Sequence, residues 1–186
     1  MKFTKIPANT FEKLQLNAGV LLSEFNPAEG TVTEGNILGA TSGGVNFAAT
    51  PTYTDYGEDI DNCPKNTKEL KRLDEWVAKL SGTYLTVDTE RAKKLLAAAD
   101  VSGNKITPRD NLKLADFSDI WWVGDYSSTS GDGFIAVRLI DALSTDGFQI
   151  QSGNRTKGQF AFNYTAHYSM SAPDTVPFEI YIGTGA

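Results

Sequence analysis

Apolar and polar residues alternate along two long stretches of the chain. In residues 45–54, Val, Phe, Ala, Pro and Tyr occupy every second position, with Asn, Ala and Thr between them. In residues 159–170, Phe, Tyr, Ala and Met alternate with Gln, Asn, Thr, His and Ser. A period of two residues indicates β-strands whose two faces differ. Pro51 has no amide hydrogen to give to a sheet, which predicts that the first strand lies at an edge or bends there.

Four further strands are predicted where short apolar segments are bounded by turn-forming residues. They cover residues 119–124, 133–143, 147–151 and 178–182. The separators between them are rich in Ser, Asp, Gly and Asn, which favour turns. Many strands joined by tight turns are typical of a β-sandwich or a β-barrel.

One α-helix is predicted at residues 90–99. Asp88 or Thr89 can cap its N-terminus, and Leu95 and Leu96 belong to an apolar stripe at helical spacing. A helix this short is marginal on its own in water, so we expect it to pack on the sheet.

Two readings stay open for residues 67–80. Leucine and valine recur there at helical spacing, yet the segment continues into residues 81–87, which have the composition of a strand. Residues 57–69 form a long polar loop under either reading. Loops of this length within a compact domain usually have a role or lack order.

Composition and charge narrow the class of protein. The chain has 186 residues, which suits a single domain with a substantial core. Its 17 Lys and Arg residues are outnumbered by 23 Asp and Glu residues, for a net charge of −6. Binding to nucleic-acid phosphates needs a basic patch, so this balance argues against a tight nucleic-acid binder. The first residues have no apolar stretch of the kind found in a signal peptide, and we expect no insertion into a membrane.

The residues that usually carry catalysis are scarce. His167 is the only histidine, and the pattern puts it on the polar face of a strand, without a nucleophile motif that would complete a hydrolase triad. Cys63 is the only cysteine, so no internal disulfide can form, and its acidic neighbours do not resemble the electropositive surroundings of a reactive thiol. Residues 100–111 begin like a calcium-binding loop but lack its glycine and its final glutamate. We therefore expect no enzyme, no metal and no cofactor.

The order of the segments resembles a known family. The strings that carry the resemblance are a threonine-rich strand at 43–55, an acidic loop at 57–64, the segment at 76–87, the helix at 90–99, Asp119-Ile120-Trp121-Trp122-Val123-Gly124-Asp125-Tyr126, Gly158-Gln159-Phe160-Ala161-Phe162-Asn163-Tyr164, and Thr175-Val176-Pro177-Phe178-Glu179-Ile180-Tyr181-Ile182. Over residues 11–182 this order is similar to that of the major tail tube proteins of long, non-contractile phage tails, from phages and prophages of Gram-positive bacteria. No single motif carries it.

The resemblance implies a mainly β fold, a sandwich or barrel of two roughly orthogonal sheets flanked by one α-helix. It implies a single domain over residues 1–186 with flexible ends, and a strand at 76–87 that leaves a long inter-strand loop at 57–72. It also implies hexameric rings whose inner strands join into one barrel, and stacking of the rings into the tube that conducts DNA without binding it specifically. The implied partners are other copies of the chain and the tape measure, tail terminator and distal tail proteins. The implied location is the virion tail, made and assembled in the bacterial host cytoplasm.

Two sets of candidate residues follow from this resemblance. In this family the loop between those two strands commonly contacts the adjacent ring, and its charges here run from acidic to basic. The charged residues of the loop are Glu58, Asp59, Asp61, Lys65, Lys68, Lys71 and Arg72. A solvated loop without a role stays an alternative, because exposed ion pairs contribute only about 0–1 kcal/mol each.

Small polar side chains on the two alternating strands would suit a lumen through which DNA slides without sticking. The candidates are Asn46, Thr50, Thr52, Thr54, Asn163 and Thr165. Such side chains suit any hydrated sheet face equally well. The alternative function is a jelly-roll carbohydrate-binding module, with Trp121, Trp122 or Tyr126 as the platform on which a sugar would stack.

Overall fold

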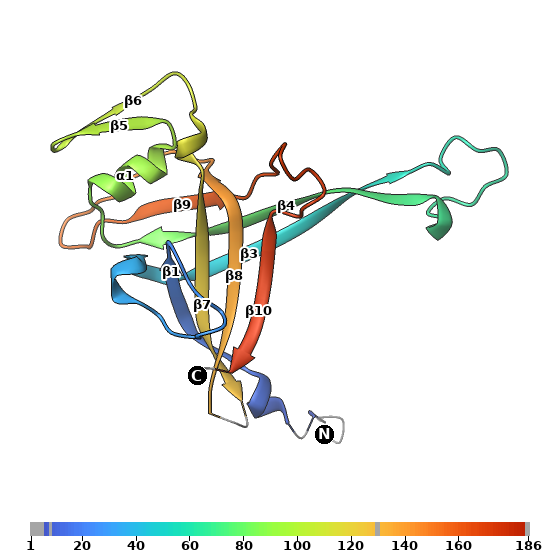
Figure 1. Ribbon diagram of the computed structural model, residues 1–186, viewed down its shortest axis with the longest axis horizontal. Coiled ribbons are helices and arrows are strands. Elements are labelled where there is room, and N and C mark those ends of the chain that lie inside the picture. The colour runs from blue at the N-terminus through green and yellow to red at the C-terminus, as the bar shows by residue number, and fades with distance from the viewer. Residues whose placement is uncertain (1–5, 8, 129–130, 185–186) are drawn as a thin grey trace.

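The computed structural model describes residues 6–7, 9–128 and 131–184 (Figure 1). The expected flexible ends fall on residues 1–5 and 185–186, which lie outside the described residues. The described chain is mainly β, with antiparallel strands and one α-helix, as the sequence predicted. The strands are β1 Gln15–Leu22, β2 Ile37–Gly39, β3 Thr41–Asp55, β4 Lys71–Tyr84, β5 Ala99–Ser102, β6 Lys105–Pro108, β7 Ser118–Ser128, β8 Gly131–Ser144, β9 Phe160–Thr165 and β10 Phe178–Thr184. The helices are α1 Thr89–Leu96 and the short 3-10 helices η1 Thr10–Lys13, η2 Glu34–Asn36, η3 Lys68–Leu70 and η4 Leu114–Asp116.

Strand β8 connects two groups of strands. Along most of its length it pairs with β7 on one side and β10 on the other, and β7 continues the sheet through β1 to β2. At its end, Leu143 and Ser144 pair with β9, which continues through β4 to β3. In Figure 1 the strands β3, β4 and β9 run across the direction of β7, β8 and β10. The fold therefore has two differently directed sets of strands that share one strand.

The main core lies where these two sets face each other. The alternation in β9 produces this burial, because Phe160, Phe162 and Tyr164 are buried while Ala161 is exposed. The residues of this core are Leu21, Ala78, Leu80, Tyr84, Leu95, Ile120, Leu139, Ala142, Phe160, Phe162, Tyr164 and Ala166. A second cluster covers the other face of the β1–β7–β8 sheet and consists of Leu22, Phe25, Trp121, Val123, Phe134 and Ala136.

Helix α1 is shorter than the sequence pattern predicts. Asp88 caps it, because its Oδ1 accepts a hydrogen bond of 2.8 Å from the backbone N–H of Arg91. The helix ends at Leu96, and Ala97 takes a φ of 61° that turns the chain away. Ala99, predicted as the last helical residue, instead begins the β5–β6 hairpin, whose pairing the sequence pattern did not indicate.

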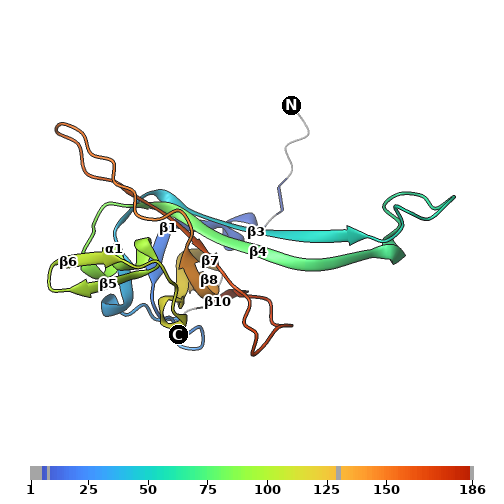
Figure 2. The same ribbon diagram turned by 90° about the horizontal axis from the view of Figure 1, so that it is seen from above.

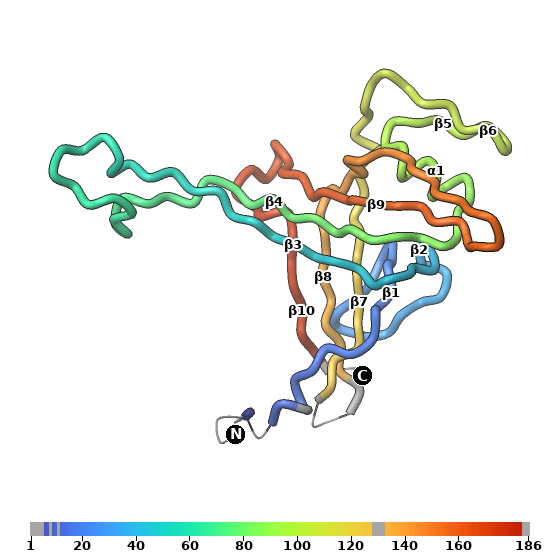
Figure 3. The backbone as a smooth tube through the Cα atoms, turned by 180° about the vertical axis from the view of Figure 1, so that it is seen from behind, coloured from blue at the N-terminus to red at the C-terminus, as the bar shows by residue number. Residues whose placement is uncertain are grey.

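Strands β3 and β4 form one long hairpin. They pair from Thr41 opposite Tyr84 to Asp55 opposite Lys71, with β-bulges on the way. Of β4, only residues 79–84 pair with β9, so within the described residues the far half of the hairpin has no strand beside it. Figure 2 shows this half extending away from the rest of the molecule, and in Figure 3, seen from behind, it again stands clear of β7, β8 and β10. We call residues 52–75 the arm and residues 56–70 within it the tip loop.

The hairpin corrects the predicted loop boundaries. The loop was expected at 57–72 and the following strand at 76–87, but β4 already begins at Lys71 and ends at Tyr84. Lys71 and Arg72 are therefore strand residues. The reason is that β3 pairs with them. Thr54 lies opposite Arg72 and Asp55 opposite Lys71, so the ladder extends into the predicted loop. Within the described residues β3 pairs only with β4, which agrees with the edge position predicted from Pro51.

Two other predicted strands need correction. Residues 147–151 do not form a strand, and only an isolated bridge joins Gln151 to Gln159. The second alternating strand ends at Thr165, so His167 is not on the polar face of a strand. The backbone N–H of His167 donates to the carbonyl of Ile140 at 3.2 Å, which draws the chain off the β9 ladder.

Candidate assembly surfaces

The tip loop is organised by a single carboxylate. Asp55, at the end of β3, accepts hydrogen bonds from the backbone N–H groups of Gly57 and Asn66, each at 2.9 Å. Both bonds stabilise the ionised carboxylate and so hold the pKa of Asp55 below its ordinary value, with the larger effect from Gly57 and the next from Asn66. The backbone N–H of Tyr56 bonds to the carbonyl of Leu70 at 3.0 Å and closes the loop at its base.

The acidic residues at the start of the tip loop do not pair with the basic residues that follow them. Five of the seven predicted residues lie on the tip loop, and Lys71 and Arg72 lie on β4. In the described part of the chain, no ion pair joins the acidic group Glu58, Asp59 and Asp61 to a basic side chain. The basic residues have other neighbours. Lys68 pairs with Glu69 at 3.4 Å and Arg72 with Asp74 at 3.8 Å. The Lys71 Nζ atom lies 5.1 Å from the centre of the Tyr53 ring. The acidic group is therefore not neutralised by the arm itself.

The arm also exposes large apolar side chains. Tyr53 and Leu73, which face each other across the ladder, are 51% and 44% exposed. Tyr56 and Ile60 on the tip loop are at least half exposed. The arm therefore presents several large apolar side chains together on a protruding element, a feature often found at contact surfaces.

The six predicted lumen residues share one face of the β3–β4–β9 sheet. Register places Asn46 beside Ser81, and Ser81 beside Asn163. Thr165 lies beside Lys79 in the same way. The opposite face holds the buried core residues. Thr50 lies on β3 near the base of the arm, whereas Thr52 and Thr54 lie on the arm itself, so the polar face continues outward from the body.

A few charged groups lie on this polar face. Along β4 its positions include the cations Lys79 and Arg72, the latter opposite Thr54, and the carboxylate Glu75. A further carboxylate, Asp146, accepts hydrogen bonds of 3.1 Å from the amide of Asn163. Thr165 lies within 3.2 Å of the hydroxyl of Thr145. The face is thus built mainly from small hydroxyl and amide groups.

Residues with catalytic potential are not brought together. His167 packs edge-on against Phe117, with ring centres 5.2 Å apart, and its Nδ1 lies 3.1 Å from the carbonyl of Asp141. Cys63 sits in the tip loop beside Thr67, with its Sγ 3.7 Å from the hydroxyl. The described residues contain no cluster of three or more His, Cys, Asp or Glu side chains placed to hold a metal ion. Among them, no helix has the length and apolar character needed to cross a lipid bilayer.

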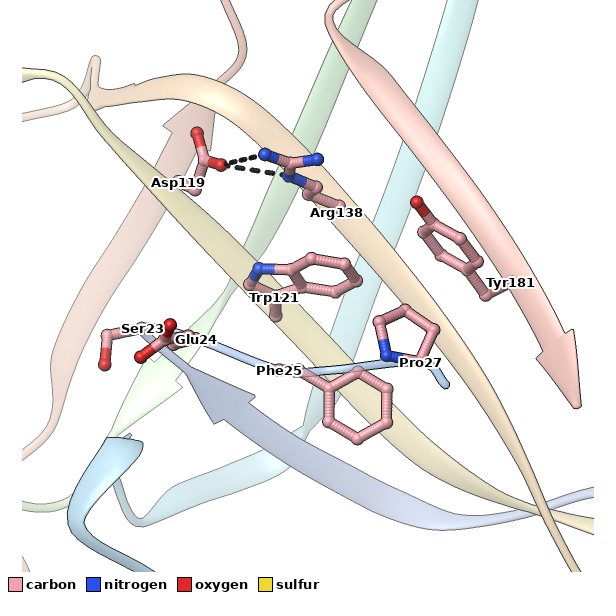
Figure 4. A pocket seen from close by; sticks show the side chains of 8 residues that line it. All are labelled: Ser23, Glu24, Phe25, Pro27, Asp119, Trp121, Arg138 and Tyr181. Atoms are coloured by element: carbon pink, nitrogen blue, oxygen red, sulfur yellow. Dashed lines mark hydrogen bonds and ion pairs between the residues drawn. The ribbon is translucent and has the colours of Figure 1, made fainter. Parts of the chain in front are cut away.

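A cavity of about 600 Å³ lies beside β7, β8 and the segment that follows β1 (Figure 4). Arg138 dominates its chemistry, bonding to Asp119 through two guanidinium nitrogens at 2.6 and 2.9 Å and to Glu179 at 3.0 Å. The Tyr181 hydroxyl donates to Glu179 at 2.7 Å and, with Arg138, holds the pKa of Glu179 below its ordinary value. Arg138, Asp119 and Glu179 are therefore paired with one another, whereas Glu24, which also lines the cavity, forms no ion pair within the described residues.

Tryptophan residues give little support to a sugar platform. Trp121 is 6% exposed, and its indole is surrounded by the Arg138 guanidinium at 5.4 Å and by the rings of Phe25 and Tyr181 at 5.7 and 5.6 Å. The Trp122 indole donates from Nε1 to the carbonyl of Ala18 at 3.0 Å and packs against backbone. Stacking of a sugar needs a free aromatic face, which Trp121 does not offer.

In the described part of the chain, strands β3 and β10 each have a free edge, where backbone N–H and C=O groups lack a neighbouring strand. Within the described residues, β10 pairs only with β8 and β3 only with β4, so each has one unpaired edge. Unpaired edges of this length invite pairing with another chain.

Neither the comparison with protein-family models nor the comparison with curated proteins finds a match for this chain.

Proposed function

We propose that this protein is a structural virion protein, the major tail tube protein of a long, non-contractile phage tail. Copies of the chain assemble into hexameric rings, and the rings stack into the conduit through which DNA is ejected. The chain acts through contacts with itself rather than through catalysis. The proposal rests on the order of sequence segments and on the shape of the hairpin.

The arm is the observation that carries the proposal. Tyr53 and Leu73 remain about half exposed on an element that leaves the body, and the acidic group of the tip loop finds no ion-pair partner in the described chain. An isolated domain gains nothing from such an extension, because ordering it costs conformational entropy that its own contacts do not recover. An arm that reaches a neighbouring ring recovers this cost in the assembly.

The two differently directed sets of strands are consistent with the fold of a tail tube protein. We propose that they form the β-sandwich of roughly orthogonal sheets expected for a tail tube protein, with α1 on its flank. Joining of open strand edges between neighbours would bury the edges that one protomer leaves unpaired. Stacking through the arm is a contact between two different surfaces, which propagates instead of closing on itself.

The polar face supports a role as the wall of the conduit. Its groups are mainly Thr, Ser and Asn, and its two β4 cations, Lys79 and Arg72, stand at separate positions of the ladder. DNA phosphates bind where Lys and Arg gather, so such a wall holds DNA weakly and lets it pass. The proposal extends to the partners named by the resemblance, which are the tape measure, tail terminator and distal tail proteins, and to assembly in the bacterial cytoplasm.

Electron microscopy of the concentrated purified protein tests the proposal. We expect rings or tubes from the wild-type chain. In a matched variant, Lys65, Lys68 and Lys71 are each replaced by Glu, which removes the charge polarity of the arm. We expect this variant to keep its circular dichroism spectrum but to form no tubes. In the proposed contact between the arm and a neighbouring ring, like charges would then meet where opposite charges meet in the wild type.

A control variant carries Lys105→Glu, Lys113→Glu and Lys157→Glu, which change the net charge equally but lie outside the arm. It should still form tubes. A wild-type protein that stays monomeric at high concentration, or an arm variant that forms normal tubes, would contradict the proposal. Affinity of the monomer for a glycan would favour the carbohydrate-binding module instead.

A further inference from the structure

Two apolar stripes of this chain remain uncovered, and both continue from the same internal contact. At that contact the base of the β3–β4 hairpin packs on the start of β10. The ring of Phe178 lies 5.7 Å from the ring of Phe47 and 5.7 Å from the ring of Trp76, measured between ring centres. Away from this point, each stripe continues along its own strand into solvent.

The first stripe follows the hairpin outward. Register puts Pro51 opposite Trp76 and Tyr53 opposite Leu73, so these residues lie on the side of the ladder that faces the core at the base. In the arm no strand of the described chain packs on this side; only the Lys71 Nζ atom lies over the Tyr53 ring, and Tyr53 and Leu73 remain 51% and 44% exposed. The opposite side of the arm carries the polar residues Thr52 and Thr54.

The second stripe follows β10. Ile180 and Ile182 alternate with Glu179 and Tyr181, so they share the side of the strand on which Phe178 meets the hairpin. They are 51% and 62% exposed. They pair opposite Val137 and Ile135 of β8, and the outer edge of β10 is unpaired within the described residues.

The chain cannot join its own two stripes. In Figure 1 the arm and β10 leave the shared contact in different directions, and paired strands are too stiff to bend back through such an angle without a break in the ladder. A second copy brings the missing surface. The arm of a second copy has the same apolar side as the hairpin base, which packs on Phe178 at the start of β10 within one chain. The β10 strand of a second copy likewise has the face on which that side packs.

We propose that the arm of one copy docks on the β8–β10 face of another copy, with Tyr53 and Leu73 against Ile180 and Ile182. This inference rests on the proposed function, and it specifies the surface that receives the arm. The contact repeats between two copies the packing that the hairpin base makes within one copy. Because donor and acceptor surfaces differ, each copy donates one arm and accepts one, and the contact runs on from copy to copy.

Disulfide crosslinking tests this docking. In a Cys63→Ser background, which removes the only native thiol, one chain carries both Tyr53→Cys and Ile182→Cys. Both positions are more than half exposed, so the variant should fold, which circular dichroism and the urea midpoint of dilute protein check. After mild oxidation of the assembled protein, denaturing gels should show a ladder of covalent oligomers.

Two controls separate this contact from random collision. Mixing chains that carry only Tyr53→Cys with chains that carry only Ile182→Cys should give dimers and no ladder, because each chain then has one reactive site. A chain with Tyr53→Cys and Leu114→Cys should give no ladder, although Leu114 is 92% exposed.

The outcomes distinguish this inference from the proposed function. Rings or tubes seen by electron microscopy without a Tyr53–Ile182 ladder would overturn the docking and leave the tail tube proposal in place. A ladder equally strong in the Leu114 control would also overturn the docking. Protein that stays monomeric by ultracentrifugation would overturn both.

Discussion

Asp55 shows how one side chain can order an exposed loop. Its two carboxylate oxygens accept separate bonds, Oδ1 from the N–H of Gly57 and Oδ2 from the N–H of Asn66. These bonds join the first and the later half of the tip loop. The same bonds hold the pKa of Asp55 below its ordinary value, and the attraction of Lys71 adds to them in the same direction. Loop order is thereby linked to the ionised state of one residue.

Replacing Asp55 with Asn should loosen the later half of the tip loop. An amide side chain has one acceptor oxygen, so it can keep the bond to Gly57 but must lose the bond to Asn66. We expect a lower hydrogen-exchange protection factor for the amide of Asn66, measured by nuclear magnetic resonance, and little change at Gly57. Asp61→Asn in the same loop is the matched control and should change neither.

The pH dependence of the wild type follows from the sign of the shift. Because the folded pKa is lowered, the carboxylate stabilises the loop fully above the unfolded value of about 3.9, and this stabilisation is lost as the pH falls through the folded value. The protection factor of Asn66 should therefore stay constant near neutrality and fall in acid. Constant protection down to pH 2 would contradict this role of Asp55.

At the scale of elements, strand β1 depends on a bulge that only glycine fits. The register of β1 on β7 shifts between Leu16 and Val20, and Gly19 lies in this interval with a φ of +69°. A Cβ atom there would lie 2.5 Å from the Trp122 Nε1 atom and 2.6 Å from the carbonyl oxygen of Val123. The bulge brings the Trp122 indole against the strand and lets it bond to Ala18.

Gly19→Ala should destabilise the protein strongly. We expect a loss of about 2–4 kcal/mol in the free energy of unfolding, since left-handed strain adds to an overpacked contact. Gly103→Ala is the matched control, because Gly103 has a φ of +60° but no atom within 4 Å of a built Cβ. It should cost only about 1–2 kcal/mol, the strain alone. Urea unfolding of dilute protein, followed by tryptophan fluorescence, measures both, and equal losses would refute the steric account.

For the whole molecule, the net charge of −6 gains meaning from its distribution. Acidic side chains gather on the tip loop, whereas the polar face of β3, β4 and β9 carries cations and carboxylates singly, without a basic cluster. Under the proposed function, such a face keeps DNA moving because it offers no basic cluster. A strongly basic wall would be incompatible with this account.

Adding positive charge to the polar face should make assembled protein retain DNA. Asn46→Lys and Ser81→Lys lie side by side on the ladder, so together they create a basic pair on each copy. When the protein assembles in the presence of a short duplex, the variant should protect the DNA from nuclease at low salt, and protection should fall as salt rises. The wild type should protect little.

Ser102→Lys and Asn104→Lys on the β5–β6 turn provide the control, with the same added charge at another surface. This control should bind DNA without protecting it from nuclease. Equal protection by both variants would contradict a lumen lined by the polar face.

Much of the fold could be predicted from local patterns. The period-two alternation correctly identified β3 and β9, and the cap at Asp88 identified the start of α1. Strand β1 was missed because its first half, from Gln15 to Ala18, is exposed and shows no alternation in burial. The β5–β6 hairpin was missed because its strands have four residues each, too few for a clear period.

The arm shows where local pattern is insufficient. Leu70, Leu73 and Leu80 have the spacing of a helix, but pairing with β3 makes Leu73 and Leu80 strand residues, and Leu70 lies in a single 3-10 turn. The candidate loop was therefore placed correctly in its first part and too far along the chain at its end. The exposure of Ile180 and Ile182 was not predicted at all, because an apolar strand is normally expected to be covered.

The sequence by itself determined that the chain is mainly extended with one helix, that its net charge is negative and that the residues usual in catalysis are few, because these follow from the spacing of neighbouring residues and from composition. Only the tertiary structure decided that the β3–β4 ladder extends beyond β9, and that β10 continues beyond the point where the hairpin packs on Phe178. Exposure depends on which strands lie side by side across long separations in the chain. Whether an apolar face is core or contact surface is therefore a property of the assembled sheets, and no local pattern encodes it.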